Sequence, residues 1–238
     1  MGLQNVFERY EIKYLLTEAQ KKRVLAAMEP YVEQDAFGRS VIRNVYYDTD
    51  DYRLARKSLE GPPYKEKLRV RSYRQAKPED GVFIELKKKY EGVVYKRRIQ
   101  LPEKTAAAYL AGRGEAPGRS QIGAEIDYFL KFYGTLSPKV FLSYEREAWF
   151  AKGSGAFRVT FDENVLWRDT ALSLREGIYG AALLAPGQTL MEVKTPGGIP
   201  LWLVKALSAA NLRQAHFSKY VNAYVALYHA RKGESVYA

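Results

Sequence analysis

Basic residues recur at every second position in several short segments of this sequence, a spacing that suits the binding of a polyanion. The charged rows are Arg9-Glu11-Lys13, Lys67-Arg69-Arg71, Glu85-Lys87, Lys96-Arg98, Arg146, Arg158 and Glu192-Lys194. In a β-strand, residues i and i+2 lie on the same face. Arg offers phosphate a planar bidentate fork, and Lys offers it a compact point charge. The pattern therefore predicts a cationic face that holds a string of phosphates.

Three glutamates share these cationic rows. Glu11, Glu85 and Glu192 would repel phosphate unless a divalent cation lay between protein and ligand. Mg²⁺ binds through one or two carboxylates together with substrate phosphates, and Mn²⁺ serves the same chemistry. The rows therefore predict Mn²⁺ or Mg²⁺ as a cofactor. Asp162, in the row that begins at Arg158, is expected to cap a turn, and an inward-facing role stays open as the alternative.

Composition restricts the class of protein. The 238 residues carry a formal net charge of +11, contain no Cys and only two His, which excludes disulfides, thiolate sites and a His-rich zinc site. Neither a signal-peptide core nor an apolar run of about 18 residues occurs, so no membrane segment is expected. We expect a soluble, cytoplasmic protein whose residues 1–238 form a single domain and whose partners are acidic.

The elements that must position the charged rows follow from periodicity and turn signals. Strands are predicted at 7–15, 41–48, 66–74, 82–90, 93–101, 139–150, 156–162 and 189–194. Helices are predicted at 18–32, 49–59, 103–111, 120–133, 200–210 and 217–231. Alternation within 82–90 places Lys87 and Lys89 on the charged face and Lys88 in solvent. These elements predict an α+β fold, an eight-stranded antiparallel β-barrel tunnel with a charged interior, flanked by helices that cover its apolar outside.

The ordered motifs of the chain resemble the VTC domain, the catalytic module of the vacuolar transporter chaperone polyphosphate polymerase, in the triphosphate tunnel metalloenzyme superfamily. The resemblance covers about residues 5–228. The motifs are Arg9-Tyr-Glu-Ile-Lys-Tyr14, Lys67-Leu-Arg-Val-Arg71, Phe83-Ile-Glu-Leu-Lys87, Tyr95-Lys-Arg-Arg98, Tyr144-Glu-Arg-Glu-Ala148, Arg158-Val-Thr-Phe-Asp162, Met191-Glu-Val-Lys194 and Phe217-Ser-Lys-Tyr220.

The resemblance implies a metal-dependent phosphotransferase that moves the γ-phosphate of ATP, or of another nucleoside triphosphate, onto inorganic polyphosphate or pyrophosphate. It implies that Glu192 is the chief metal ligand, assisted by Glu11 or Glu85. The residues expected to act in transfer are Arg69, Arg71, Lys87, Arg146, Arg158 and Glu192. The residues expected to bind substrate phosphates are Lys13, Lys67, Arg69, Arg71, Lys87, Lys96, Arg98, Arg146, Arg158, Lys194, Ser218 and Lys219.

One position departs from the hydrolase branch of the superfamily, whose first strand carries Glu-x-Glu-x-Lys. Arg9 stands here at the first Glu position, which weakens a two-metal hydrolytic site and favours the polymerase reading. Two alternatives stay open: a tripolyphosphate or nucleoside-triphosphate hydrolase of the same fold, and a non-catalytic binder of polyphosphate or RNA. Acidic residues on the basic face argue against RNA, so no nucleic-acid partner is expected.

Overall fold

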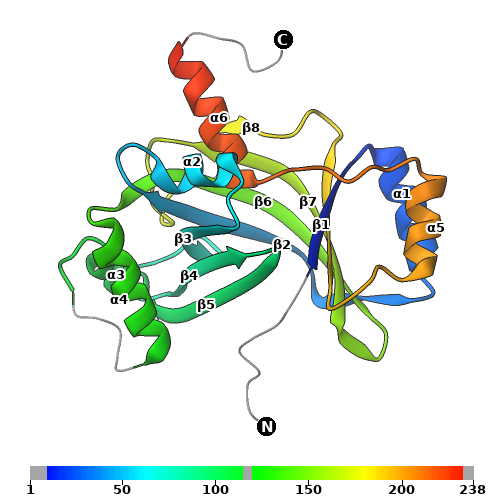
Figure 1. Ribbon diagram of the computed structural model, residues 1–238, viewed down its shortest axis with the longest axis horizontal. Coiled ribbons are helices and arrows are strands. Elements are labelled where there is room, and N and C mark those ends of the chain that lie inside the picture. The colour runs from blue at the N-terminus through cyan, green and yellow to red at the C-terminus, as the bar shows by residue number, and fades with distance from the viewer. Residues whose placement is uncertain (1–9, 115–119, 233–238) are drawn as a thin grey trace.

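The computed structural model describes residues 10–114 and 120–232, and its centre is one antiparallel sheet (Figure 1). The strands run in the order β1-β9-β7-β6-β2-β3-β4-β5, and short β8 pairs with β7 off this path. Their bounds are β1 Tyr10–Leu16, β2 Val32–Asp48, β3 Tyr64–Ser72, β4 Gly81–Tyr90, β5 Val93–Pro102, β6 Ser137–Ala151, β7 Ser154–Arg168, β8 Ala181–Ala182 and β9 Thr189–Thr195.

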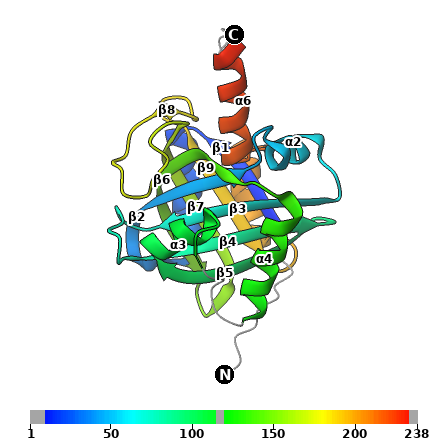
Figure 2. The same cartoon turned by 90° about the vertical axis from the view of Figure 1, so that its left-hand side faces the viewer.

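The sheet curls strongly, so that β2–β5 cross in front of β1, β7 and β9 in Figure 2. It does not close into the expected barrel, because within the described chain no ladder joins the edge strands β1 and β5. The free edge of β1 has another partner: Ala215 N donates to Lys13 O at 2.7 Å, and Tyr14 bridges to Gln214. The segment before the last helix therefore occupies backbone groups that barrel closure would have needed.

The described residues form six helices in three groups: α1 with α5 and α3 with α4 cover the outer face of the sheet, whereas α6 and one side of α2 pack against cavity-facing residues such as Tyr46 and Tyr144. Their bounds are α1 Glu18–Met28, α2 Arg53–Glu60, α3 Glu103–Leu110, α4 Gln121–Tyr133, α5 Leu201–Ala209 and α6 Lys219–Lys232. In Figure 1, α3 and α4 lie against the β3–β5 end, α1 and α5 against the opposite end, and α2 and α6 above the sheet. Each group closes an apolar cluster of its own.

Alternation along β3 decides which side chains reach the inside of the curled sheet. Leu68 and Val70 are buried in the cluster beneath α3 and α4, whereas Lys67, Arg69 and Arg71 line the concave side. Burying the apolar positions contributes about 25 cal/mol per Å² and fixes this register, because a one-residue slip would exchange the two faces. The α+β class and the helix-covered apolar face are as the sequence predicted.

Two strands are longer than the sequence predicted. β2 begins at Val32 rather than 41, and β7 continues to Arg168 rather than ending at 162. The early part of β2 contains Asp35 and Gly38, which are poor strand formers, and its register shifts between Gln34 and Arg39. Pairing with the 15-residue β6 holds this polar stretch in the sheet, so tertiary contacts override local propensity.

Candidate active site

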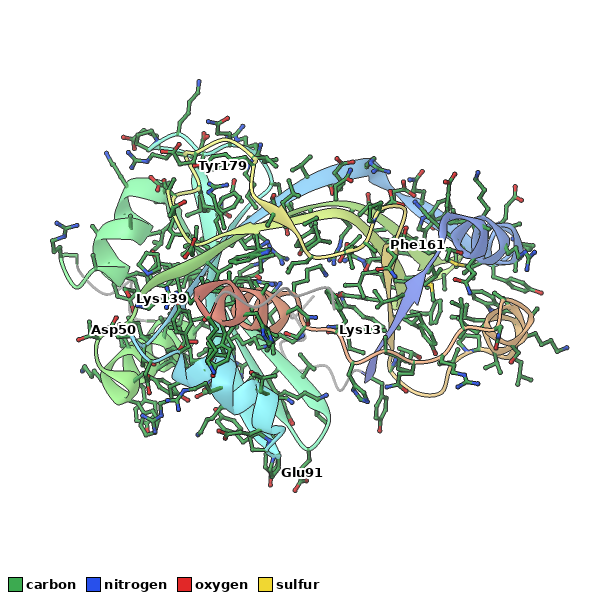
Figure 3. The ribbon with its side chains drawn as sticks, turned by 90° about the horizontal axis from the view of Figure 1, so that it is seen from above. Lys13, Asp50, Glu91, Lys139, Phe161 and Tyr179 are labelled. Atoms are coloured by element: carbon green, nitrogen blue, oxygen red, sulfur yellow. The ribbon has the colours of Figure 1, made fainter. Side chains whose placement is uncertain are left out.

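The concave side of the sheet encloses a cavity of about 1800 Å³. Every phosphate-binding residue predicted from the sequence lines it, as do Glu11 and Glu192. Those residues are Lys13, Lys67, Arg69, Arg71, Lys87, Lys96, Arg98, Arg146, Arg158, Lys194, Ser218 and Lys219. Figure 3 shows Lys13 in the middle of the molecule, beside the chain leading into α6. The charged rows of distant strands thus converge on one space.

Glu85 lies beneath the cavity wall on β4 and is 1% exposed. Its Oε2 accepts from Arg69 Nε at 2.9 Å, and its Oε1 lies 2.6 Å from Lys96 Nζ and accepts from Arg98 Nε at 3.0 Å. Burial alone would raise the pKa of Glu85, but Arg69, Arg71 and Lys96 outweigh it and hold the pKa well below its ordinary value. We call these five residues the Glu85 cluster.

A second cluster lies on β6, β7, β9 and the start of α6, and we call it the Glu192 cluster: Arg146, Asp162, Glu192, Lys194 and Lys219. Arg146 donates twice to Asp162, at 2.6 Å each, and Lys219 Nζ lies 2.5 Å from Asp162 and 3.0 Å from Glu192. Lys194 and Arg146 each lie 3.4 Å from Glu192 Oε2. Burial would raise the pKa of Glu192, but Lys219 and Lys194 keep it well below its usual range.

Lys13 and Glu11 on β1 connect the two sides of the open sheet. Lys13 Nζ donates to Phe217 O at 2.8 Å and lies 3.2 Å from Glu11 Oε1 and 3.8 Å from Glu192 Oε1. Lys87 Nζ on β4 lies 3.0 Å from Glu11 Oε2. The Lys87–Glu11 ion pair therefore crosses from β4 to β1, where the described backbone forms no ladder.

Two tyrosines orient the arginines of β3. Tyr46 OH accepts from Arg69 Nη1 at 2.8 Å, and Tyr144 OH accepts from Arg71 Nη2 at 3.1 Å. Lys219 Nζ lies 4.5 Å from the Tyr144 ring centroid, so this ring joins both clusters. Burial would raise the pKa of Tyr144, but the neighbouring cations, Arg71 first among them, lower it.

Two further predicted residues, Lys67 and Arg158, contact uncharged groups. Lys67 Nζ donates to Ser218 Oγ at 2.7 Å. The guanidinium of Arg158 lies 4.7 Å from the ring centroid of Phe150, a distance typical of a cation–π contact. Arg9, the position that departs from the hydrolase motif, lies outside the described residues.

Sequence reasoning missed the roles of two inward-facing tyrosines, Tyr46 and Tyr144, and preferred the wrong one of the two roles open to Asp162. Asp162 does not cap a turn: it lies within β7, is 0% exposed and binds Arg146. Its place four residues after Arg158 puts it on the same strand face, which was the available signal. Tyr144 likewise stands two residues before Arg146. Tyr46 carried no comparable signal, because its row in β2 (Ile42, Asn44, Tyr46 and Asp48) contains no basic residue.

A divalent cation fits Glu11 and Glu192 but not Glu85. The first two carboxylates both approach the ammonium of Lys13, which shows that positive charge is stabilised between them. Both oxygens of Glu85 are already bound to side chains of β3 and β5. No group of three or more His, Cys, Asp or Glu side chains within residues 10–114 and 120–232 could hold a metal. An ion at Glu11 and Glu192 would therefore take its other ligands from phosphate and water.

The fold and the cavity define the class of protein, an α+β protein whose curled antiparallel sheet encloses a strongly basic cavity. The profile of the VTC domain matches residues 8–228, and the chain belongs to the VTC domain family. None of the curated proteins matches the chain significantly. No helix in the described part of the chain is long and apolar enough to cross a membrane.

Two solved structures are similar to the chain, and the first of them shares its fold. A Bacillus halodurans protein described as a "putative adenylate cyclase" is similar with a TM-score of 0.56 and 15% identity, over 90% of this chain and 96% of that one. A Vibrio parahaemolyticus protein of the same description gives a TM-score of 0.47 and 13% identity, over 91% and 98% of the two chains. At such identities the first similarity shows a shared fold, and the second adds no argument.

Proposed function

We propose that this protein is a phosphotransferase that moves the γ-phosphate of ATP, or of another nucleoside triphosphate, onto the end of an inorganic polyphosphate chain. The observation that carries this proposal is the 1800 Å³ cavity, on which arginines and lysines from both halves of the curled sheet converge. Glu11, Glu85, Asp162 and Glu192 neutralise only part of this density of cations, and bound phosphates would neutralise the rest. Membership of the VTC domain family supports the same substrate class.

The transfer reaction needs no nucleophile from the protein. A terminal oxygen of the acceptor chain bonds to the γ-phosphorus, and the bond from that phosphorus to the β–γ bridging oxygen breaks, releasing the nucleoside diphosphate. The transition state is loose, so positioning and charge stabilisation supply most of the catalysis. In this scheme the acceptor oxygen already carries negative charge and loses no proton.

The arginines are the groups best placed to fix the transferring phosphate. Arg69 and Arg71 are held by Tyr46 and Tyr144, so little side-chain entropy remains to be lost when phosphate binds. Fixed guanidinium forks match phosphate oxygens bidentately. A side chain already oriented in the free protein stabilises developing charge without reorganising during the reaction.

Glu192 and Glu11 are the residues that would hold Mn²⁺ or Mg²⁺, and the ion would neutralise charge on phosphate oxygens. Lys13 lies between these carboxylates and would be displaced toward the substrate by the ion. The same lysine then adds a cation on the phosphate side. The protein would then supply two carboxylate ligands, and phosphate oxygens and water would supply the other ligands of the ion.

The test is incubation with ATP, Mn²⁺ or Mg²⁺ and a pyrophosphate primer, followed by gel electrophoresis and phosphorus NMR. ADP together with long phosphate chains is the expected result. Orthophosphate without chains would instead favour a hydrolase, and tight binding without turnover would favour a non-catalytic polyphosphate binder.

Neighbouring arginines on β5 provide a matched pair of variants for this assay. Arg98 faces the cavity, whereas Arg97 lies on the other face and pairs with Glu125 at 3.2 Å. Arg98→Ala is expected to reduce chain synthesis, and Arg97→Ala is expected to leave it within about twofold, since an outer-face ion pair contributes little. Equal losses in both variants would show that the effect is not local to the cavity.

A further inference from the structure

Four lysines of β3 and β4 form two like-charge pairs across the ladder. Lys65 is the direct partner of Lys89, and Lys67 is the direct partner of Lys87. All four side chains line the cavity, and we call them the lysine ladder. Like charges directly opposite one another destabilise an antiparallel pair. Two successive pairs of this kind are therefore a structural cost that a bound anion would remove.

Carboxylates do not neutralise the lysine ladder as they neutralise the arginines. Lys87 pairs with Glu11 at 3.0 Å, and Lys67 donates to the hydroxyl of Ser218. Within the residues described, Lys65, Lys67 and Lys89 form no ion pair. Burial first, and the neighbouring lysines after it, lower the pKa of Lys67 and of Lys89.

Along β3 the inward row changes from lysine to arginine: Lys65 and Lys67 are followed by Arg69 and Arg71. Successive inward positions are about 6.6 Å apart, so the row spans about 20 Å. That length exceeds what the three phosphorus atoms of a triphosphate need. The arginines are held by phenols and by Glu85, whereas lysine ammoniums on flexible stems accept phosphates in many positions.

We propose that the lysine ladder is a chain-holding subsite, which binds phosphates of a polyphosphate chain beyond those at the arginines. The inference rests on the proposed function and deepens it by assigning a direction: the transferring phosphate lies toward Arg69 and Arg71, and the chain extends toward Lys65 and Lys89. A row of mobile point charges suits a chain that must advance by one phosphate after each transfer. Selectivity for long chains over triphosphate then resides in the ladder.

The test compares two probes, inorganic tripolyphosphate and long-chain polyphosphate, in equilibrium binding without turnover. Lys65→Gln and Lys89→Gln are each expected to weaken long-chain binding about fivefold, the effect of losing one partly exposed charge pair, and the double variant more. Affinity for tripolyphosphate is expected to change less than about twofold in the same variants. Because each substitution removes a repulsion, the melting temperature should not fall.

Lys88→Gln is the matched control, because it lies on the same strand as Lys89→Gln and removes the same charge. Lys88 faces away from the cavity and lies 3.3 Å from Glu125, so its loss should leave binding of both probes unchanged. If Lys65→Gln and Lys89→Gln weaken both probes equally, or neither, the ladder assignment is overturned while the proposed function stands. If the unmodified protein binds neither probe, the proposed function itself fails.

Discussion

The Glu85 and Glu192 clusters are built alike but bound differently. Both surround a buried carboxylate with cations. Glu85 contacts three of its four cations within 3.0 Å and Arg71 at 3.7 Å, whereas Glu192 contacts Lys219 at 3.0 Å and its other three cations at 3.4 to 3.8 Å. The cations of Glu85 come from the two strands beside its own. Those of Glu192 come from β1, β6, β9 and α6.

This difference separates two uses of a buried acid. Glu85 saturates its hydrogen-bonding capacity and acts as a fixed counter-ion that keeps β3 and β5 together. Glu192 is held at longer distances by Lys13 and Lys194, which could turn toward phosphate and leave a carboxylate oxygen to a metal ion. The structure thus supports a structural role for one glutamate and a substrate-linked role for the other.

The largest expected effect is the loss of stability on Glu85→Gln. Removing one partner of a buried ion pair leaves its cations uncompensated, which costs about 3–5 kcal/mol in the free energy of unfolding. Chemical denaturation measures it, and Glu125→Gln is the control, because Glu125 pairs with Lys88 and Arg97 on the outer face. A loss below about 1 kcal/mol would show that the ion pairs of Glu85 contribute no more to stability than exposed surface pairs do. Tripolyphosphate should restore stability in Glu85→Gln by neutralising the freed cations.

Glu192→Gln is expected to reduce turnover of ATP at least about a hundredfold, because a carboxylate that holds the metal ion is lost. The required concentration of Mn²⁺ or Mg²⁺ should rise, which a purely structural role would not produce. Glu163→Gln on the neighbouring β7, where Glu163 pairs with Lys21 at 2.8 Å, is the control. Unchanged turnover in Glu192→Gln would remove Glu192 from the metal site.

Arg69→Ala tests whether the Glu85 cluster also contacts substrate. A phosphate contact from a charged donor contributes about 1.5–3 kcal/mol, so the rate should fall at least about tenfold. Steady-state kinetics at saturating ATP would show whether the loss is in kcat. A smaller loss would indicate that the guanidinium serves Glu85 alone.

The smallest expected effect concerns the pH dependence of binding. Burial, and then Arg69 and Arg71 against the opposing pull of Glu85, lower the pKa of Lys96 to about 7. As pH rises through about 7, Lys96 loses its charge, so tripolyphosphate affinity should decrease. Lys96→Arg keeps the charge and should remove this component, a change of a few-fold, roughly 1 kcal/mol. Titration of the phosphates affects the unmodified protein and Lys96→Arg equally. Identical pH profiles for the two proteins would show that Lys96 does not cause the pH dependence of binding.

The sequence by itself determined which residues face the cavity. Strand alternation is a local property, so the rows of β3 and β9 could be assigned to one face from spacing, and all the predicted phosphate-binding residues do line one space. The start of the helix predicted from residue 18 was also fixed locally, because Thr17 and Gln20 form a capping box at the start of α1. The apolar residues at the alternate strand positions predicted helices on the outer face of the sheet, and α1, α3, α4 and α5 cover that face.

Only the tertiary structure decided which charges meet. Glu11 pairs with Lys87 because the curled sheet brings β1 beside β4, and no periodicity along either strand specifies that curl. In the described chain the sheet stays open between β1 and β5, and Ala215 instead donates a hydrogen bond to the free edge of β1. Ion pairing depends on distances of a few ångströms between chain-distant groups, whereas facing direction depends on neighbours two residues away. That physical difference divides what was predictable here from what was not.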